Sequence, residues 1–349
     1  TELSDEPFFF FFLDILAPYK LLKVEGFHGT LVVPNYGGGT ANTEFDVLTG
    51  LYSMYINPSP TAFRHVRKPF PSVASVFREN GYQTPAIHPG HGWVYRRERV
   101  YPRLGFGEFL TEKRFDAPEL KGGLIADRAA FAKLREVFET RPSPSFSYMV
   151  TIQNHTPFEN RFERGARNFT QARPFLSPAE TDILSNYFIG AADTARELKL
   201  FTDFLNGRPE PTLLVFYGDH LPSLGPAMRL YDELGFNKGL KKYETPFLFW
   251  RNDASKQFFN LEKAMDSCCV RRGDKLSAHY LGALTLELLG LDGGLLFFQY
   301  LNALRRTCPV LTIYGPPANA RAAADYHTVL YNRLKSKTPL LTLPSPPVS

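Results

Sequence analysis

The stretch 36–46, which reads Tyr-Gly-Gly-Gly-Thr-Ala-Asn-Thr-Glu-Phe-Asp, contains the first residues that could do chemistry. Its three glycines lead directly into Thr40, after a short apolar strand pattern over 30–33 and before an amphipathic helix pattern. Glycine allows the backbone to approach a ligand closely, and a helix N-terminus offers free N–H groups and a partial positive charge. The stretch therefore predicts either a hydroxyl group facing a phosphate or sulfate, or a tight turn with Thr40 as an ordinary N-cap.

Histidines and an aspartate follow three further strand patterns. His88 ends the strand predicted over 83–88, His155 follows the strand predicted over 146–152, and Asp219 and His220 follow the apolar strand predicted over 212–217. A neighbouring carboxylate and imidazole make a good pair of metal ligands. The alternatives are a turn aspartate beside a surface histidine, and structural roles for the two single histidines.

Two other groups extend this set of candidates. Asp14 follows the apolar run Phe8–Leu13, which reads as a buried strand, so Asp14 is predicted either near a ligand or in a capped turn. The segment 88–101 contains three arginines together with Tyr95 and a tryptophan. Arginine binds phosphate with its planar fork, so Arg97 and its neighbours could clamp an anion; a solvated basic helix start is the alternative.

The elements that must position these residues alternate between strand and helix. Helix patterns cover 18–25, 72–80, 124–140, 182–205, 276–289 and 320–335. Polar side chains recur where the strands end, which is typical of an α/β fold with a mostly parallel sheet, helices on both faces and one site along the carboxyl edge. We expect residues 1–250 to form the core and residues 251–349 to complete the same domain, as a smaller C-terminal subdomain with an irregular, proline-rich tail.

Composition limits the partners. The chain has 349 residues, a formal charge of +5 and 44% hydrophobic residues. The small basic excess favours anionic partners such as phosphate or lipid, but it forms no basic stripe, so nucleic acid is not expected. The chain has only three cysteines, an odd and low number that excludes a disulfide framework. The apolar run of six residues at 8–13 is too short for a membrane span and lacks the features of a signal peptide, so we expect a soluble chain or the soluble part of something larger.

Four motifs, in this order, resemble the lipoteichoic acid synthase family, whose members are sulfatase-type phosphoglycerol transferases of the alkaline phosphatase superfamily. They are Gly37-Gly-Gly-Thr-Ala-Asn-Thr-Glu-Phe, Tyr95-Arg-Arg-Glu-Arg-Val-Tyr, Gln153-Asn-His-Thr-Pro-Phe and Tyr217-Gly-Asp-His-Leu-Pro. The resemblance covers about residues 24–335 and implies an alkaline phosphatase/sulfatase-like fold. It also implies an enzyme that takes glycerol phosphate from phosphatidylglycerol and passes it to a glycerol or glycan acceptor of the cell envelope. Such an enzyme works at the extracellular face of the cell membrane.

Matching positions give each motif residue an implied role. Thr40 would be a metal-bound nucleophile, with Asp219 and His220 as further ligands of manganese, or alternatively of magnesium or zinc. His155 would bond the phosphate or carry a proton. Arg97, with Tyr95 beside it, would hold the phosphoglycerol head. His88 falls near the same pocket, and its role is left open.

The chain departs from the family at the first strand, where the family carries a glutamate ligand in a Glu-Ser motif. Asp14 could replace that glutamate, although its side chain is one methylene shorter. Three alternatives therefore remain beside phosphoglycerol transfer: hydrolysis of a phosphate or sulfate ester, transfer of phosphoethanolamine, and an inactive member that binds envelope polymer. Sulfatases use a modified cysteine or serine, so the threonine at position 40 argues against sulfate ester hydrolysis.

Overall fold

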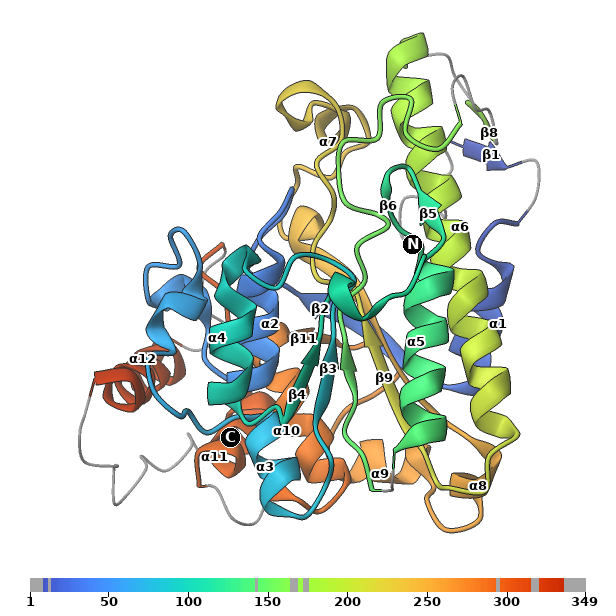
Figure 1. Ribbon diagram of the computed structural model, residues 1–349. Helices are drawn as coiled ribbons and strands as arrows, with labels where there is room; N and C mark the ends of the chain where they lie inside the picture. Colours follow the sequence, from blue (N-terminus) through green and yellow to red (C-terminus); the bar gives the residue numbers. More distant parts are fainter. Residues whose placement is uncertain are drawn as a thin grey trace.

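Helices cover both faces of a central sheet in the computed structural model (Figure 1). The structure describes residues 9–11, 14–141, 144–163, 169–171, 176–292, 296–314 and 320–335. This central sheet has four strands in the order β11 (Lys275–Ser277), β2 (Phe27–Val32), β10 (Glu244–Arg251) and β9 (Leu213–Tyr217). A second sheet has three strands in the order β4 (Glu108–Leu110), β3 (Pro85–Ile87) and β7 (Tyr148–Met149).

Strand direction brings the candidate site residues to one edge of the sheet. β11 runs parallel to β2, and β10 runs antiparallel to both β2 and β9, so β2 and β9 point the same way. β3 runs parallel to β4 and β7. The predicted α/β sheet is confirmed, but it is mixed rather than purely parallel because β10 is reversed. The segments that carry Thr40 and the Asp219–His220 pair therefore leave the sheet at the same edge.

The alternation of side chains along β10 explains why both faces are covered. Leu248 and Trp250 belong to the apolar cluster formed with α1 (Ala17–Glu25), α5 (Asp127–Thr140) and α6 (Pro178–Asn206). Phe247 and Phe249 belong to the cluster on the opposite face, with α9 (Leu261–Ser267) and α10 (Ala278–Leu288). Successive strand residues point to opposite faces, so an apolar run such as this one requires a helical layer on each side.

The helix that begins at Thr40, α2 (Thr40–Thr49), is buried along almost its whole length. It packs in one apolar cluster with α3 (Val73–Glu79), α10, α11 (Leu296–Thr307) and α12 (Ala320–Lys335). The Tyr326 hydroxyl of α12 donates a 2.9 Å hydrogen bond to the Gly50 carbonyl and accepts a 2.7 Å bond from the backbone N–H of Tyr52. The C-terminal helices therefore hold the C-terminal end of the helix that carries Thr40.

The prediction for the first strand is wrong in one respect. Within Phe8–Leu13 the structure describes only β1 (Phe9–Phe11), and β1 pairs with β8 (Phe169–Gln171) in a separate antiparallel sheet. Phe8, Phe12 and Leu13 lie outside the described residues. Local apolarity predicted a strand, but the pairing partner is set by distant residues. Asp14 consequently does not follow a strand of the central sheet.

The remaining short helices lie in the connections, and they are α4 (Arg97–Val100), α7 (Leu230–Glu233) and α8 (Asp253–Lys256). The longest helix, α6, begins with a capping box in which Ser177 and Glu180 bond each other's backbone N–H groups. Among the described helices, none combines the length and the apolarity needed to cross a bilayer.

Replacing Gly282 by alanine is expected to destabilise the fold by about 1–3 kcal/mol, because the new methyl group would overpack the contact between α10 and α2. A Cβ atom at position 282 would lie 2.2 Å from the Val47 carbonyl oxygen and 2.5 Å from Val73 Cγ2. Urea unfolding measures the change. Gly207→Ala is the matched control, because its Cβ would meet only the Phe204 oxygen, at 3.4 Å. Equal stability of the two variants would contradict this account of the helix crossing.

Candidate active site

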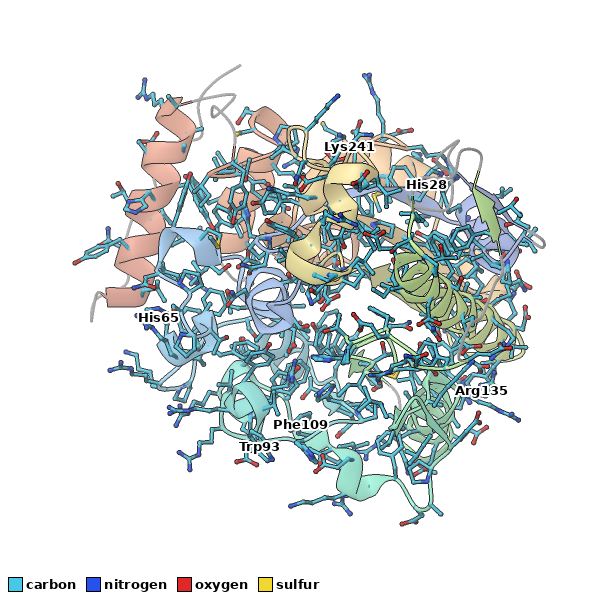
Figure 2. The ribbon with its side chains drawn as sticks, turned by 90° about the horizontal axis from the view of Figure 1, so that it is seen from above. His28, His65, Trp93, Phe109, Arg135 and Lys241 are labelled. Carbon is cyan, nitrogen blue, oxygen red and sulfur yellow. The ribbon has the colours of Figure 1, made fainter. Side chains whose placement is uncertain are left out.

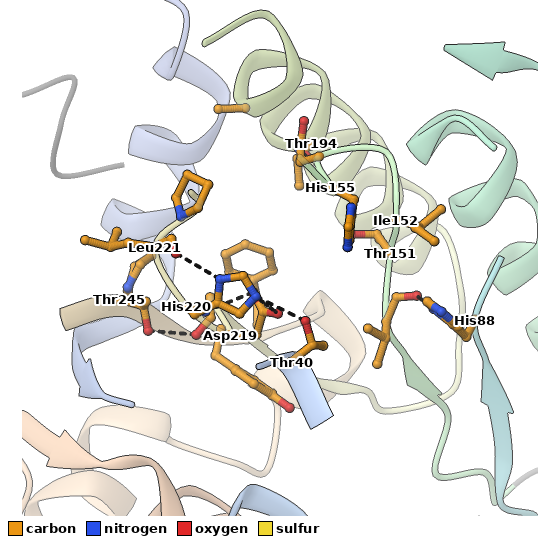
Figure 3. Close-up of a pocket in the computed structure, with 18 of the residues that line it drawn as sticks. Thr40, His88, Thr151, Ile152, His155, Thr194, Asp219, His220, Leu221 and Thr245 are labelled. Carbon is orange, nitrogen blue, oxygen red and sulfur yellow. Dashed lines mark hydrogen bonds and ion pairs between the residues drawn. The ribbon is translucent and has the colours of Figure 1, made fainter. Parts of the chain in front are cut away.

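Thr40 is the first residue of α2, directly after three glycines with positive φ angles of 73°, 145° and 98°. The N-cap is Gly39, and no side chain caps the helix. The Thr40 hydroxyl instead lies 3.2 Å from His220 Nε2 (Figure 3). The glycine turn is held against the loop after β9 by a 2.7 Å bond from the Gly37 N–H to the Leu221 carbonyl. Of the two predicted roles, the ordinary N-cap is therefore wrong, and the hydroxyl faces other polar groups.

Asp219 and His220 follow β9, and their side chains lie against Thr40. His220 Nδ1 lies 2.9 Å from the Leu221 carbonyl oxygen, which can only accept, so Nδ1 carries a proton and Nε2 is the ring nitrogen that faces Thr40. Asp219 Oδ2 lies 3.2 Å from that Nε2. The Thr43 hydroxyl donates to the Asp219 carbonyl at 2.7 Å and so ties α2 to this loop. Three electron-rich atoms, one each from Thr40, Asp219 and His220, thus converge.

This donor set fits a divalent metal ion with open coordination positions. Carboxylate, imidazole and hydroxyl groups suit manganese, magnesium or zinc, and a metal-binding histidine usually donates its second ring N–H to a carbonyl, as His220 does. Within the described part of the chain, no three His, Cys, Asp or Glu side chains cluster as a metal site. The protein ligands on offer are therefore two such side chains and the Thr40 hydroxyl.

A cavity of about 450 Å³ opens beside these groups. Its lining includes seven of the eight residues proposed from the sequence, namely Thr40, His88, Tyr95, Arg97, His155, Asp219 and His220. They come from four separate segments of the chain, which the fold brings together around the cavity. This convergence is what the strand-end pattern of the sequence predicted.

Asp14 is the predicted residue that the structure places elsewhere. It does not line the cavity, and its side chain is 52% exposed. Its carboxylate accepts a 3.3 Å bond from the backbone N–H of Leu16 and pairs with Lys20 Nζ at 3.3 Å. Asp14 thus caps the turn that precedes α1, which is the alternative that the sequence left open.

Arg97 reaches the cavity from a strained loop but is already paired. Tyr95 and Arg96 have φ angles of 55° and 58°, a conformation that is rare for residues other than glycine. Arg97, only 2% exposed, donates from Nε to both oxygens of Glu44, at 3.1 and 3.2 Å, and from Nη2 to one of them. Its guanidinium carbon also lies 5.1 Å from the centre of the Tyr95 ring.

The pairing with Glu44 changes the expected role of Arg97. Burial alone would lower the pKa of Arg97, but the nearby charge of Glu44 raises it, and the net direction is upward. Because Glu44 takes the Nε–H and one N–H of Nη2, the outer N–H groups of Nη1 and Nη2 are left to meet an anion in the cavity. Arg97 can therefore contribute charged donors from a position that Glu44 fixes.

Sequence reasoning missed Glu44 and Tyr101, whose hydroxyl also donates to the Glu44 carboxylate. The sequence spacing could have indicated Glu44, because this residue comes four positions after Thr40 and so lies on the same face of α2. Nothing local indicated the partner of Glu44, since Arg97 lies 53 residues further along the chain.

His88 and His155 present similar tautomers to the cavity. Nδ1 of His88 lies 2.9 Å from the Val150 carbonyl oxygen, and Nδ1 of His155 lies 2.7 Å from the Thr156 carbonyl oxygen. A carbonyl only accepts, so both Nδ1 atoms carry protons. Burial, together with the charge of Arg97, lowers the pKa of His88 to about 4, so this ring is neutral at neutral pH. His155 is more exposed to solvent than His88.

The wall of the cavity on the α6 side contains a second polar group that the sequence did not reveal. Asn154 donates through Nδ2 to the Thr194 hydroxyl at 2.8 Å, and Thr194 donates in turn to the Asp127 carboxylate. Burial raises the pKa of Asp127 to about 6. Asn154 and Thr194 both line the cavity. This group fixes the loop in which His155 follows Asn154.

Comparison with known proteins agrees with these motifs. A putative cyclic β-1,2-glucan modification protein of Rhizobium meliloti (strain 1021) is 32% identical over 238 residues, which are 64% of this chain and 36% of that protein. Lipoteichoic acid synthase 2 of Bacillus subtilis (strain 168) is 23% identical over 192 residues, 52% of this chain and 27% of that protein. The chain therefore matches only about a third, or less, of the length of these curated relatives.

The fold has a close structural counterpart as well. The Streptococcus pyogenes phosphoglycerol transferase GacH, solved in complex with sn-glycerol-1-phosphate, superposes with a TM-score of 0.71 at 24% identity. The match covers 93% of this chain and 81% of that one, and it confirms the alkaline phosphatase/sulfatase-like fold. The family profile described as Sulfatase matches residues 18–286. The chain thus belongs to the sulfatase family.

Proposed function

We propose that this chain is the catalytic part of a metal-dependent phosphotransferase, which moves phosphoglycerol from phosphatidylglycerol to a glycan or glycerol acceptor of the cell envelope. The observation that carries the proposal is the Thr40 hydroxyl at a helix N-terminus, 3.2 Å from His220 Nε2 and beside Asp219. The names of the relatives, a glucan modification protein and a lipoteichoic acid synthase, support a glycan or glycerol polymer of the cell envelope as the acceptor.

In the first step, Thr40 Oγ1 attacks the phosphorus of the lipid headgroup. An O–P bond to Thr40 forms and the P–O bond to diacylglycerol breaks, while His155 takes the proton of the Thr40 hydroxyl and passes it to the leaving oxygen. The N–H groups at the start of α2 and Nη1 of Arg97 hold the phosphoryl oxygens where negative charge develops. A metal ion held by Thr40, Asp219 and His220 would lower the pKa of the hydroxyl and neutralise charge.

In the second step, an acceptor hydroxyl attacks the same phosphorus. A P–O bond to the acceptor forms, the bond to Thr40 breaks, and His155 passes the acceptor proton to Thr40 Oγ1, which restores both side chains. The neutral His88 ring, fixed by Val150, shapes the cavity without adding a charge. Water in place of the acceptor would turn the same sequence of steps into hydrolysis.

The test is an assay of purified protein with phosphatidylglycerol in detergent, with manganese, magnesium or zinc. Transfer predicts release of diacylglycerol that rises when the acceptor glycan is added, with phosphoglycerol recovered on the glycan. Free glycerol phosphate at an acceptor-independent rate would replace the proposal with hydrolysis. An absence of turnover with all three metals would favour a member that only binds envelope polymer.

Metal binding gives a separate prediction. Asp219→Asn and His220→Gln are each expected to weaken manganese binding by about 10–100-fold or more, because each removes one of few protein ligands. Isothermal titration calorimetry measures the affinity. Asp14→Asn is the matched control and should bind like the wild type, because Asp14 caps the turn before α1 and does not line the cavity. Weakened binding in Asp14→Asn, or unchanged binding in Asp219→Asn, would contradict this ligand set.

A further inference from the structure

Trp93 stands exposed at the rim of the proposed active site. Its side chain is 66% exposed, whereas the chain's other tryptophan, Trp250, is 1% exposed. Its neighbours His91, Val94 and Tyr95 all line the cavity. In the view from above, Trp93 lies toward the edge of the molecule (Figure 2). Single exposed apolar side chains are common on protein surfaces, so the surroundings of this one must decide whether it has a role.

The indole is held in a fixed position by its loop. The His91 ring stacks on it, with ring centres 5.6 Å apart and planes 14° from parallel. His91 Nδ1 is in turn bound to Glu112 Oε1 at 3.0 Å. Backbone bonds of 3.0 Å from Val94 to His91 and 2.8 Å from Arg96 to Trp93 close the loop on either side. His91 therefore covers one face of the indole. Because the loop already holds the ring, a ligand that binds to the exposed face would cost little side-chain entropy.

Charged side chains of both signs lie close to Trp93 in the chain. The exposed Arg96 and Arg99 are accompanied by the exposed Glu98, and Glu112 is followed by the exposed Lys113 and Arg114. An anionic membrane would select for positive charge alone around an interfacial tryptophan. A sugar ring fits better, because its C–H face stacks on an aromatic ring, while its hydroxyl groups use donors and acceptors of both signs.

We propose that the exposed face of Trp93 binds a sugar ring of the acceptor glycan and so positions a hydroxyl group of that glycan over the cavity. The inference rests on the proposed function, since it assigns a place to the acceptor of that reaction. Trp93 is a positioning residue in this scheme, because it contacts the acceptor away from the phosphorus. The ligand class is a neutral glycan, as distinct from a lipid surface.

Tryptophan fluorescence tests the proposal directly, because Trp250 is buried and an emission change on glycan binding reports on Trp93. The probe is cyclic β-1,2-glucan, titrated into the Thr40→Ala protein so that no turnover occurs. We expect a blue shift with saturation. Trp93→Ala, followed by calorimetry, should lose at least about tenfold in glycan affinity, and Trp93→Tyr should recover most of it. Phe258→Ala, which removes a 69% exposed ring elsewhere, should bind like the parent.

Kinetics separate this proposal from the proposed function. Trp93→Ala should raise the KM for glycan while leaving the acceptor-independent release of diacylglycerol unchanged. Glycan affinity that does not change in Trp93→Ala would overturn the subsite. So would a Trp93-dependent loss of binding to phosphatidylglycerol vesicles without a loss of glycan binding, which would assign the indole to the membrane. A wild type that binds glycan through Trp93 but transfers nothing would instead reject the proposed function alone.

Discussion

Thr40→Ala is expected to lower turnover by about 10⁴-fold or more, because it removes the atom proposed to form the covalent bond to phosphorus. The fold should survive the change. The Thr40 side chain makes no helix cap, and its hydroxyl bond to His220 lies in a solvent-accessible cavity. The measurement is diacylglycerol release from phosphatidylglycerol at saturating metal, together with the urea midpoint of each protein.

Thr40→Ser is the matched variant for this prediction. Serine keeps the hydroxyl group and should retain a measurable part of the activity, whereas alanine should not. Substantial turnover by a folded Thr40→Ala protein would remove Thr40 from the nucleophile role. An inactive Thr40→Ser protein with wild-type stability would show that the methyl group matters as well, and would argue against a simple hydroxyl nucleophile.

The second large effect is expected at Glu44, where alanine should destabilise the fold by about 3–5 kcal/mol. The Glu44 side chain is 1% exposed and that of Arg97 2% exposed, so removal of the carboxylate leaves a buried guanidinium without its partner. Tyr101 loses its acceptor at the same time. Urea unfolding measures the change, with the m-value checked for constancy.

A double variant separates stability from function at this pair. Glu44→Leu combined with Arg97→Met replaces both charges by apolar groups of similar size and should recover most of the lost stability. It should not recover activity, because the charged Nη1 donor is gone. If the double variant were as active as the wild type, Arg97 would have no part in binding the anion. If Glu44→Ala were as stable as the wild type, the pair could not be the buried contact described here.

Most of the candidate site residues could be grouped from the sequence because their grouping depends on one simple rule of α/β sheets. Residues after strands that run in the same direction meet at one edge, so Thr40, His155 and the Asp219–His220 pair could be grouped without knowledge of strand order. The cavity brings these groups together. The structure adds the tautomer of His220 and the closeness of its Nε2 to Thr40, which no spacing in the sequence could provide.

What the sequence could not provide depends on long-range pairing. β10 has the same apolar composition whichever way it runs, so its reversal left no local trace. The apolar run before Asp14 predicts a strand, yet its described part pairs with a segment about 160 residues away, outside the central sheet. In the sequence, Glu44 resembles any polar residue on the solvent side of an amphipathic helix. Only the folded structure places Arg97 opposite it. In each case a distant partner decides the outcome.

The most direct test of the central claim is mass spectrometry of the peptide that contains Thr40, after brief incubation with phosphatidylglycerol and manganese in the absence of acceptor. Our account predicts that this peptide gains the mass of one phosphoglycerol group, that fragmentation places the group on Thr40, and that added glycan removes it. Under conditions in which diacylglycerol is released, an unmodified Thr40 peptide, or a group placed on any other residue, would contradict it.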